Sequence, residues 1–293
     1  MRALPLLLAF ALSAVPSFAV PPGDPLAREL ARLSKEGFTD VQRADAKVRE
    51  GLLSALVVRR SDGGGSRLLV YLSGDAKARL LHFEPSLAGI RLSALHVDGT
   101  LPDLAGDGSR TIAYVVSFSG LEQDALVLLR YGKGRVERLG KPMPFTDFED
   151  VDVDGNLELV RREKPLGRFF SMDCESFFTM AGKAEKTTIL LLKGRRLVDV
   201  SARYPAFYRA HMGRLETELA SNDPMKTQRF EDYLSTSLAL YFDYETLGRR
   251  KEGYDRLRKA YKLPRAAPSG IRSCADKMGA ELRQKLNVPS DWD

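Results

Sequence analysis

Residues 111–120 read TIAYVVSFSG, and residues 124–132 read DALVLLRYG. Both runs are rich in Val, Leu, Ile and aromatic residues and are bounded by glycine or polar residues, which is typical of short β-strands. Similar runs occur from about residue 52 to residue 200: SALVVRR, RLLVYLSG, ARLLHFEP, RLSALHV, RVERLG and TTILLLKG. Many short strands at fairly even spacing predict an antiparallel β architecture, either closed or built of blades.

The sequence changes to a helical period after residue 201. The segments with this period are ARYPAFYRAHMGRLETEL, RFEDYLSTSLALYFDYETLG, RRKEGYDRLRKAYKL and SGIRSCADKMGAELRQKL. Asp223-Pro224 and Gly248 mark breaks between them. Near the N-terminus, Asp24-Pro25 begins a further helix, which Gly37 ends, because Asp is a preferred N-cap and proline suits the first helical position.

The expected fold class is therefore α+β, with mainly antiparallel β structure followed by a C-terminal α-helical domain. We divide the chain into a signal peptide over residues 1–19, a spacer and N-terminal helix over residues 20–50, a β domain over residues 51–200 and a helical domain over residues 201–293.

The first nineteen residues have the pattern of a signal peptide. A positive start at Met1-Arg2 precedes an apolar run from Leu6 to Val15, and Ser17 and Ala19 supply the small residues of a cleavage site. The run is shorter than the about 20 residues that span a bilayer. We predict an exported protein, periplasmic or secreted, without a membrane span.

The distribution of charge narrows the class of partner. The chain has 45 basic and 39 acidic residues in a mixed order, which disfavours a nucleic acid partner and leaves a protein or glycan partner.

Cys174 and Cys274 are the only cysteines of the chain. They are either a disulfide or two separate buried thiols, and we favour the disulfide because an exported chain reaches an oxidising compartment.

Residues 148–160 read FEDVDVDGNLELV and contain a candidate metal loop. Asp150, Asp152 and Asp154 occupy loop positions 1, 3 and 5, and Glu158 occupies position 9. Alternate carboxylates around a glycine can supply the oxygen ligands that Ca²⁺ needs. The alternative is a solvated turn. The loop is not an EF-hand, because position 12 is Arg161 rather than glutamate.

A second copy of this loop begins 47 residues earlier, where residues 103–115 read DLAGDGSRTIAYV. Asp103, Asp107 and Gly108 match positions 1, 5 and 6, whereas Ala105 and Thr111 replace the acidic residues of positions 3 and 9. We expect this copy to keep the turn without the ion.

The acidic pattern leading into a strand resembles the calcium loop of FG-GAP/VCBS repeats. The resemblance implies four-stranded blades of an integrin-like β-propeller, with Ca²⁺ bound at Asp150, Asp152, Asp154 and Glu158. Residues 50–200 have room for only three such blades, so a propeller-like assembly or a partial propeller is expected.

The helical part resembles the second half of one tetratricopeptide repeat. The matching residues are Leu247, Gly248, Leu257, Ala260 and Pro264, and Gly253 stands where the family has alanine. A single hairpin of this kind does not form a solenoid, so we expect it to pack on the β part.

Catalytic motifs are scarce in this sequence. It has His82, His96 and His211 but no HExxH, nucleophile elbow or Walker A motif. Asp173 and Glu175 are the candidates for a carboxylate pair. The expected function is an exported, non-catalytic binding or scaffolding protein with a calcium-stabilised β domain. The alternative is an exported hydrolase acting on polysaccharide or cell-envelope material.

Overall fold

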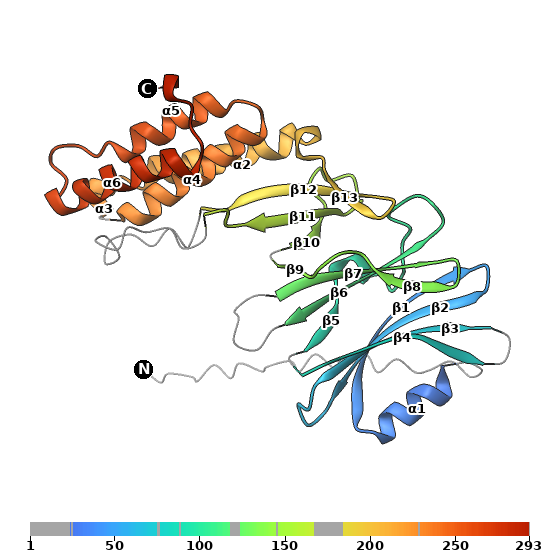
Figure 1. Ribbon diagram of the computed structural model, residues 1–293. Helices are drawn as coiled ribbons and strands as arrows, with labels where there is room; N and C mark the ends of the chain where they lie inside the picture. The colour runs from blue at the N-terminus through green and yellow to red at the C-terminus, as the bar shows by residue number, and fades with distance from the viewer. Residues whose placement is uncertain are drawn as a thin grey trace, which may run out of the picture.

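The computed structural model describes residues 24, 26–74, 77–87, 89–117, 124–144, 146–166, 184–227 and 229–292. The predicted signal peptide lies outside these residues. Within the described part, the strands form three antiparallel sheets, and helices follow them (Figure 1). The predicted α+β class is confirmed.

Each sheet is an up-and-down meander whose strands pair in sequence order. The first sheet contains β1 (Phe38–Val48), β2 (Gly51–Arg60), β3 (Ser66–Ser73) and β4 (Ala78–Ser86). The second contains β5 (Ile90–Leu92), β6 (Arg110–Ser117), β7 (Asp124–Gly132) and β8 (Arg135–Arg138), and the short β9 (Met143–Pro144) also pairs with β7. The third contains β10 (Thr146–Glu149), β11 (Glu158–Glu163), β12 (Lys186–Lys193) and β13 (Arg196–Asp199).

The second sheet is buried on both faces. Ile112 and Tyr114 of β6 pack with residues of the first sheet, whereas Ala113 and Val115 pack with residues of the third sheet. This explains why TIAYVV is a continuous apolar run, because alternate side chains of a strand point to opposite faces.

Helices cover the two ends of this stack. Leu33 of α1 (Ala27–Lys35) packs with Leu56 and Val58 on the outer face of the first sheet. At the other end, Ile189 of the third sheet packs with Tyr208 of α2 (Pro205–Ser221). In the part of the chain that is described, the stacked sheets do not close into a ring, so the fold is an open stack with a helix against each end sheet.

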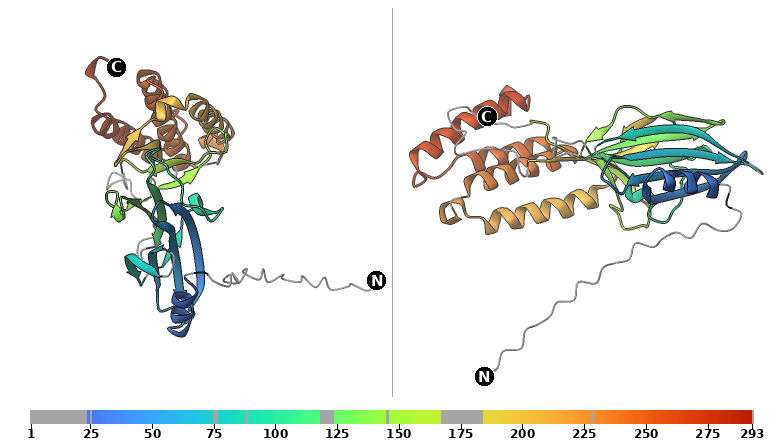
Figure 2. Two further views of the ribbon diagram at one scale, coloured as in Figure 1. Left: turned by 90° about the vertical axis from the view of Figure 1, so that its right-hand side faces the viewer. Right: turned by 90° about the horizontal axis from the view of Figure 1, so that it is seen from below.

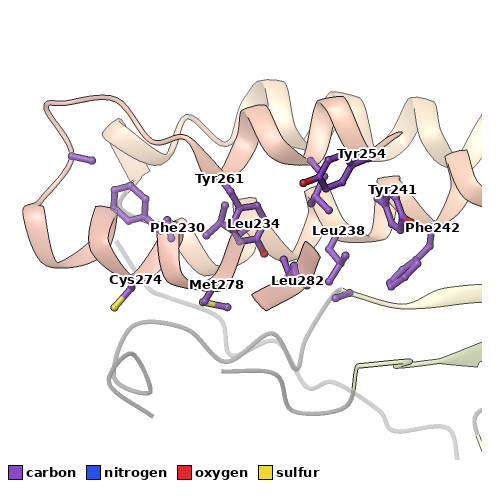
Figure 3. Packing of buried hydrophobic residues seen from close by; sticks show 14 residues of the cluster. Phe230, Leu234, Leu238, Tyr241, Phe242, Tyr254, Tyr261, Cys274, Met278 and Leu282 are labelled. Atoms are coloured by element: carbon purple, nitrogen blue, oxygen red, sulfur yellow. The ribbon is translucent and has the colours of Figure 1, made fainter. Parts of the chain in front are cut away.

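The C-terminal helices extend away from the sheets (Figure 2). They are η3 (Ser201–Arg203), α2, α3 (Pro224–Thr227), α4 (Phe230–Thr246), α5 (Arg250–Tyr261), α6 (Ser269–Lys285) and η4 (Ser290–Trp292). Leu238 and Tyr241 of α4, Tyr254 of α5 and Met278 of α6 share one hydrophobic cluster (Figure 3). None of the helices in the described ranges has the length and apolar character to cross a membrane.

Two segments differ from the sequence prediction. The boundary at residue 51 falls inside the first sheet, because β1 is a half-exposed edge strand whose polar side chains hide its period. The run RLSALHV was predicted as one strand, but the strand β5 ends at Leu92 and a 3₁₀ turn, η1 (Ala94–His96), follows.

His96 explains this turn. Its Nδ1 donates to the carbonyl oxygen of Thr100 at 2.7 Å, and its Nε2 accepts the backbone N–H of Ala113 at 2.8 Å. Burial lowers the pKa of His96, which keeps the imidazole neutral and able to accept this bond. The side chain thus ties the loop after β5 to the middle of β6.

Candidate metal loop and its repeat

The acidic loop and its earlier copy occupy the same place in consecutive sheets. The copy, residues 103–109, leads into β6, the second strand of the second sheet, and residues 150–157 lead into β11, the second strand of the third sheet. The alignment of the two sequences therefore corresponds to a structural repeat. In the first sheet, the connection before the second strand is instead a tight turn between β1 and β2.

The two loops also have the same internal hydrogen bonds. Asp103 accepts the N–H groups of Asp107 and Gly108 at 3.3 and 2.6 Å, and Asp150 accepts those of Asp154 and Gly155 at 3.0 and 3.1 Å. In addition, the aspartate at position 5 of each loop accepts the N–H two residues later, at 3.0 Å in the copy and 2.7 Å in the acidic loop. The expectation that the copy keeps the turn is confirmed.

Both turns need a residue with positive φ at position 4. That residue is Gly106 in the copy, with φ of 66°, and Val153 in the acidic loop, with φ of 61°. The left-handed region is unfavourable for β-branched residues. Because the Val153 side chain is 87 % exposed, packing does not compensate for this strain.

Replacing Val153 with glycine is expected to raise the free energy of unfolding by about 0.5–1 kcal/mol, since relief of the strain exceeds the entropic cost of glycine. Denaturant unfolding without added metal checks this value. Val153→Ala retains the positive φ and is the control. If the alanine variant gains as much as the glycine variant, the strain is not the cause.

Three of the four predicted ligands lie together. Carboxylate oxygens of Asp150, Asp152 and Glu158 lie within 4.8 Å of one another. Ligands 2.3–2.6 Å from one Ca²⁺ are at most roughly 5 Å apart, so this spacing fits a single ion. Asp154 lies outside the group, and its two carboxylate oxygens accept hydrogen bonds from Asn156 at 2.7 and 3.0 Å.

The electrostatic surroundings distinguish the acidic loop from its copy. Burial raises the pKa of Glu158, and the charges of Asp152 and Asp154 raise it further. Among the described residues, no basic side chain forms an ion pair with Asp150 or with these three acids.

The copy has a guanidinium at the corresponding place. Arg130 Nη2 lies 2.5 Å from Asp107 Oδ2, and Arg130 stands opposite Thr111 in the β6–β7 register. Thr111 corresponds to Glu158, which lies opposite Leu191 when the Leu159–Leu190 register is continued. An arginine in one sheet thus corresponds to a 42 % exposed leucine in the other. Among the described residues, the carboxylates of the acidic loop thus lack the basic partner that the copy has.

The other predicted site residues cannot be placed relative to one another, because three of them lie outside the described residues. Asp173, Glu175 and Cys174 lie outside the described residues, so the hydrolase pair and the Cys174–Cys274 pairing stay predictions. Cys274 is buried in the cluster formed by α4, α5 and α6, and it is not a free thiol.

Sequence reasoning missed one contact between a histidine and a buried carboxylate. Asp243 of α4 is 2 % exposed, and its Oδ2 lies 2.7 Å from Nδ1 of His211 on α2. The helical period of α4 indicates that Asp243 faces neighbouring helices, but it does not indicate which residue meets it.

Comparison of the chain with models of protein families, with curated proteins and with solved structures found no match.

Proposed function

We propose that this protein is an exported, non-catalytic binding or scaffolding protein in which Ca²⁺ stabilises the third sheet. Asp150, Asp152 and Glu158 would hold the ion. The contrast between the two loops carries the proposal. They share one turn, but within the described part of the chain only the copy has an arginine paired with its acids. Bound Ca²⁺ would relieve the repulsion among the carboxylates of the acidic loop.

We also propose that the stacked sheets are blades of a partial propeller similar to FG-GAP/VCBS repeats. Support comes from the up-and-down strand order and from matching loops 47 residues apart. The helical hairpin α4–α5 would be the tetratricopeptide-like element, and the signal-peptide pattern of residues 1–19 supports export.

The surroundings of the histidines support a non-catalytic role. His96 bonds two backbone groups, and His211 contacts the buried carboxylate of Asp243. Nε2 of His82 lies 3.5 Å from Glu84. These contacts give each ring a structural role.

Calcium is expected to stabilise the mature protein, residues 20–293, against thermal unfolding. At about ten times the dissociation constant, a ligand that binds only the folded state adds about 1.4 kcal/mol. For a chain of this size, this corresponds to a rise in Tm of about 3 °C relative to protein in chelator. Calorimetry in the presence and absence of Ca²⁺ measures the shift.

Asp152→Asn should abolish this shift, because it removes one carboxylate while the turn keeps its bonds to Asp150 and Asp154. Asp276→Asn on α6 removes an equal charge elsewhere and should respond like the wild type. An unchanged Tm of the wild-type protein in millimolar Ca²⁺, or an equal response of both variants, would make the loop a solvated turn.

A further inference from the structure

A cavity of about 480 Å³ lies beside the copy loop and is lined in part by residues 107–110. Its walls come from three places in the chain: the turn between β1 and β2, residues 107–110, and the turn between β7 and β8. The cavity does not include the acidic loop, so it can be tested separately from the calcium proposal.

The lining of this cavity is strongly basic. It contains five basic and two acidic side chains, so its net formal charge is +3. Those side chains are Lys47, Arg49, Arg110, Arg130 and Lys133, with Glu50 and Asp107. Asp107 is neutralised by Arg130, and Glu50 accepts a hydrogen bond from the Tyr131 hydroxyl at 3.2 Å.

In the described part of the chain, four of these five cations form no ion pair with an acidic side chain. Arg130 pairs with Asp107 and Glu137, but in the described ranges no acidic side chain forms an ion pair with the other basic residues of the lining. Repulsion among cations gathered around one cavity is unfavourable unless an anion offsets it.

Arg110 lines the cavity and forms no ion pair with an acidic side chain among the described residues. Its Nε is buried without a hydrogen-bond acceptor among the described groups, as are the Nε atoms of Arg130 and of two arginines outside the cavity, Arg161 and Arg272. A buried donor without an acceptor costs free energy, and buried polar groups in proteins are nearly always paired. An anion held by the guanidinium of Arg110 and the neighbouring cations would offset the positive charge gathered around the cavity.

We propose that this cavity binds a tetrahedral oxyanion, as carried by a phosphate or sulfate ester. The cationic groups approach from three walls, and a tetrahedral group presents oxygens in several directions, whereas a carboxylate presents two in one plane. The volume also leaves room for part of the molecule that carries the group. The protein would thus bind a phosphorylated or sulfated compound next to the copy loop.

Titration with inorganic phosphate, followed by ³¹P NMR at about 0.15 M constant ionic strength and without added Ca²⁺, tests the proposal. Saturable binding is expected, with sulfate competing and citrate competing more weakly. Equal competition by chloride at the same ionic strength would overturn it. Phosphomonoester and sulfate-ester probes then distinguish the two sources of the oxyanion.

Arg110→Met is the deciding variant. It removes the guanidinium but keeps a side chain of similar length, so binding should weaken about tenfold, as loss of a charged hydrogen bond does. The Tm without phosphate should not fall, because an unpaired buried donor is removed. Lys133→Asn, which suits the positive φ of that residue, should weaken binding as well.

Arg135→Met is the matched control. Arg135 lies on β8 in the same hairpin, is exposed and does not line the cavity. Its replacement makes the same chemical change and should leave phosphate binding within about twofold. Equal losses in the two Arg→Met variants would show a diffuse attraction to a basic surface and would refute a defined site.

Discussion

Replacing Gly253 with alanine is expected to lower the free energy of unfolding by about 2 kcal/mol. Gly253 lies in α5, where α5 crosses α4. A Cβ at this position would lie 2.5 Å from Cβ of Tyr244 and 3.3 Å from the carbonyl oxygen of Tyr241. Neither atom is the free end of a side chain, so the two helices must separate to admit the methyl group.

Two opposing effects determine the sign of this result. Alanine is favoured over glycine in a helix by about 1 kcal/mol. Overpacking a tight contact costs about 1–3 kcal/mol or more, and here it would also disturb Tyr241 and Tyr254 in the helical cluster. Because the clash involves backbone and Cβ atoms, we expect overpacking to be the larger effect.

Gly213→Ala supplies the control for helix propensity. Gly213 lies in α2, and a Cβ there would meet nothing within 4 Å. This variant should gain up to about 1 kcal/mol in the same denaturant experiment. If Gly253→Ala were as stable as Gly213→Ala, α4 and α5 would not pack as closely at Gly253 as described.

His211→Ala is expected to destabilise the protein by about 3 kcal/mol at neutral pH. Nδ1 of His211 on α2 lies 2.7 Å from Oδ2 of Asp243, which is 2 % exposed on α4. Removing one member of a buried pair leaves an uncompensated charge, at a cost of about 3–5 kcal/mol. We take the lower end because Asp243 can accept a proton, and because the His211 side chain itself is 25 % exposed. Urea unfolding of both proteins measures the difference.

The loss should depend on pH. Burial raises the pKa of Asp243 above its ordinary value of 3.8, and His211 opposes this rise. A carboxyl with a raised folded-state pKa binds its proton more tightly when folded, so its contribution to stability falls as the pH rises above about 3.8. Without His211 that pKa rises further, and the penalty of His211→Ala should shrink when the pH is lowered from 7 toward 4.

Asp243→Asn is the matching variant. The amide has almost the shape of the carboxylate but no charge to bury, so Asp243→Asn combined with His211→Ala should recover much of the loss. The unfolding free energy of the Asp243→Asn variant should also lack the pH dependence that titration of Asp243 causes. Equal destabilisation by His211→Ala at pH 7 and pH 4.5 would mean that lost packing, including the stacking of His211 on Phe207, causes the effect.

The local structure of most elements could be predicted from the amino-acid sequence. Strand runs such as TIAYVV and the breaks at Asp223-Pro224 and Gly248 appear where they were predicted, because side-chain periodicity and turn residues act over a few positions. The 47-residue repeat of the loop was also visible, because the aspartates and glycines that form the turn are adjacent in the chain.

Contacts between distant segments were decided only by the tertiary structure. β1 takes its place through pairing with β2, although its own pattern is mostly polar. Arg130 meets Asp107, and Asp243 meets His211, because separate elements pack side by side. The basic cavity likewise joins three turns that are far apart in sequence. Charge pairing, burial and cavities depend on which surfaces come together, and the local pattern of a chain does not carry that information.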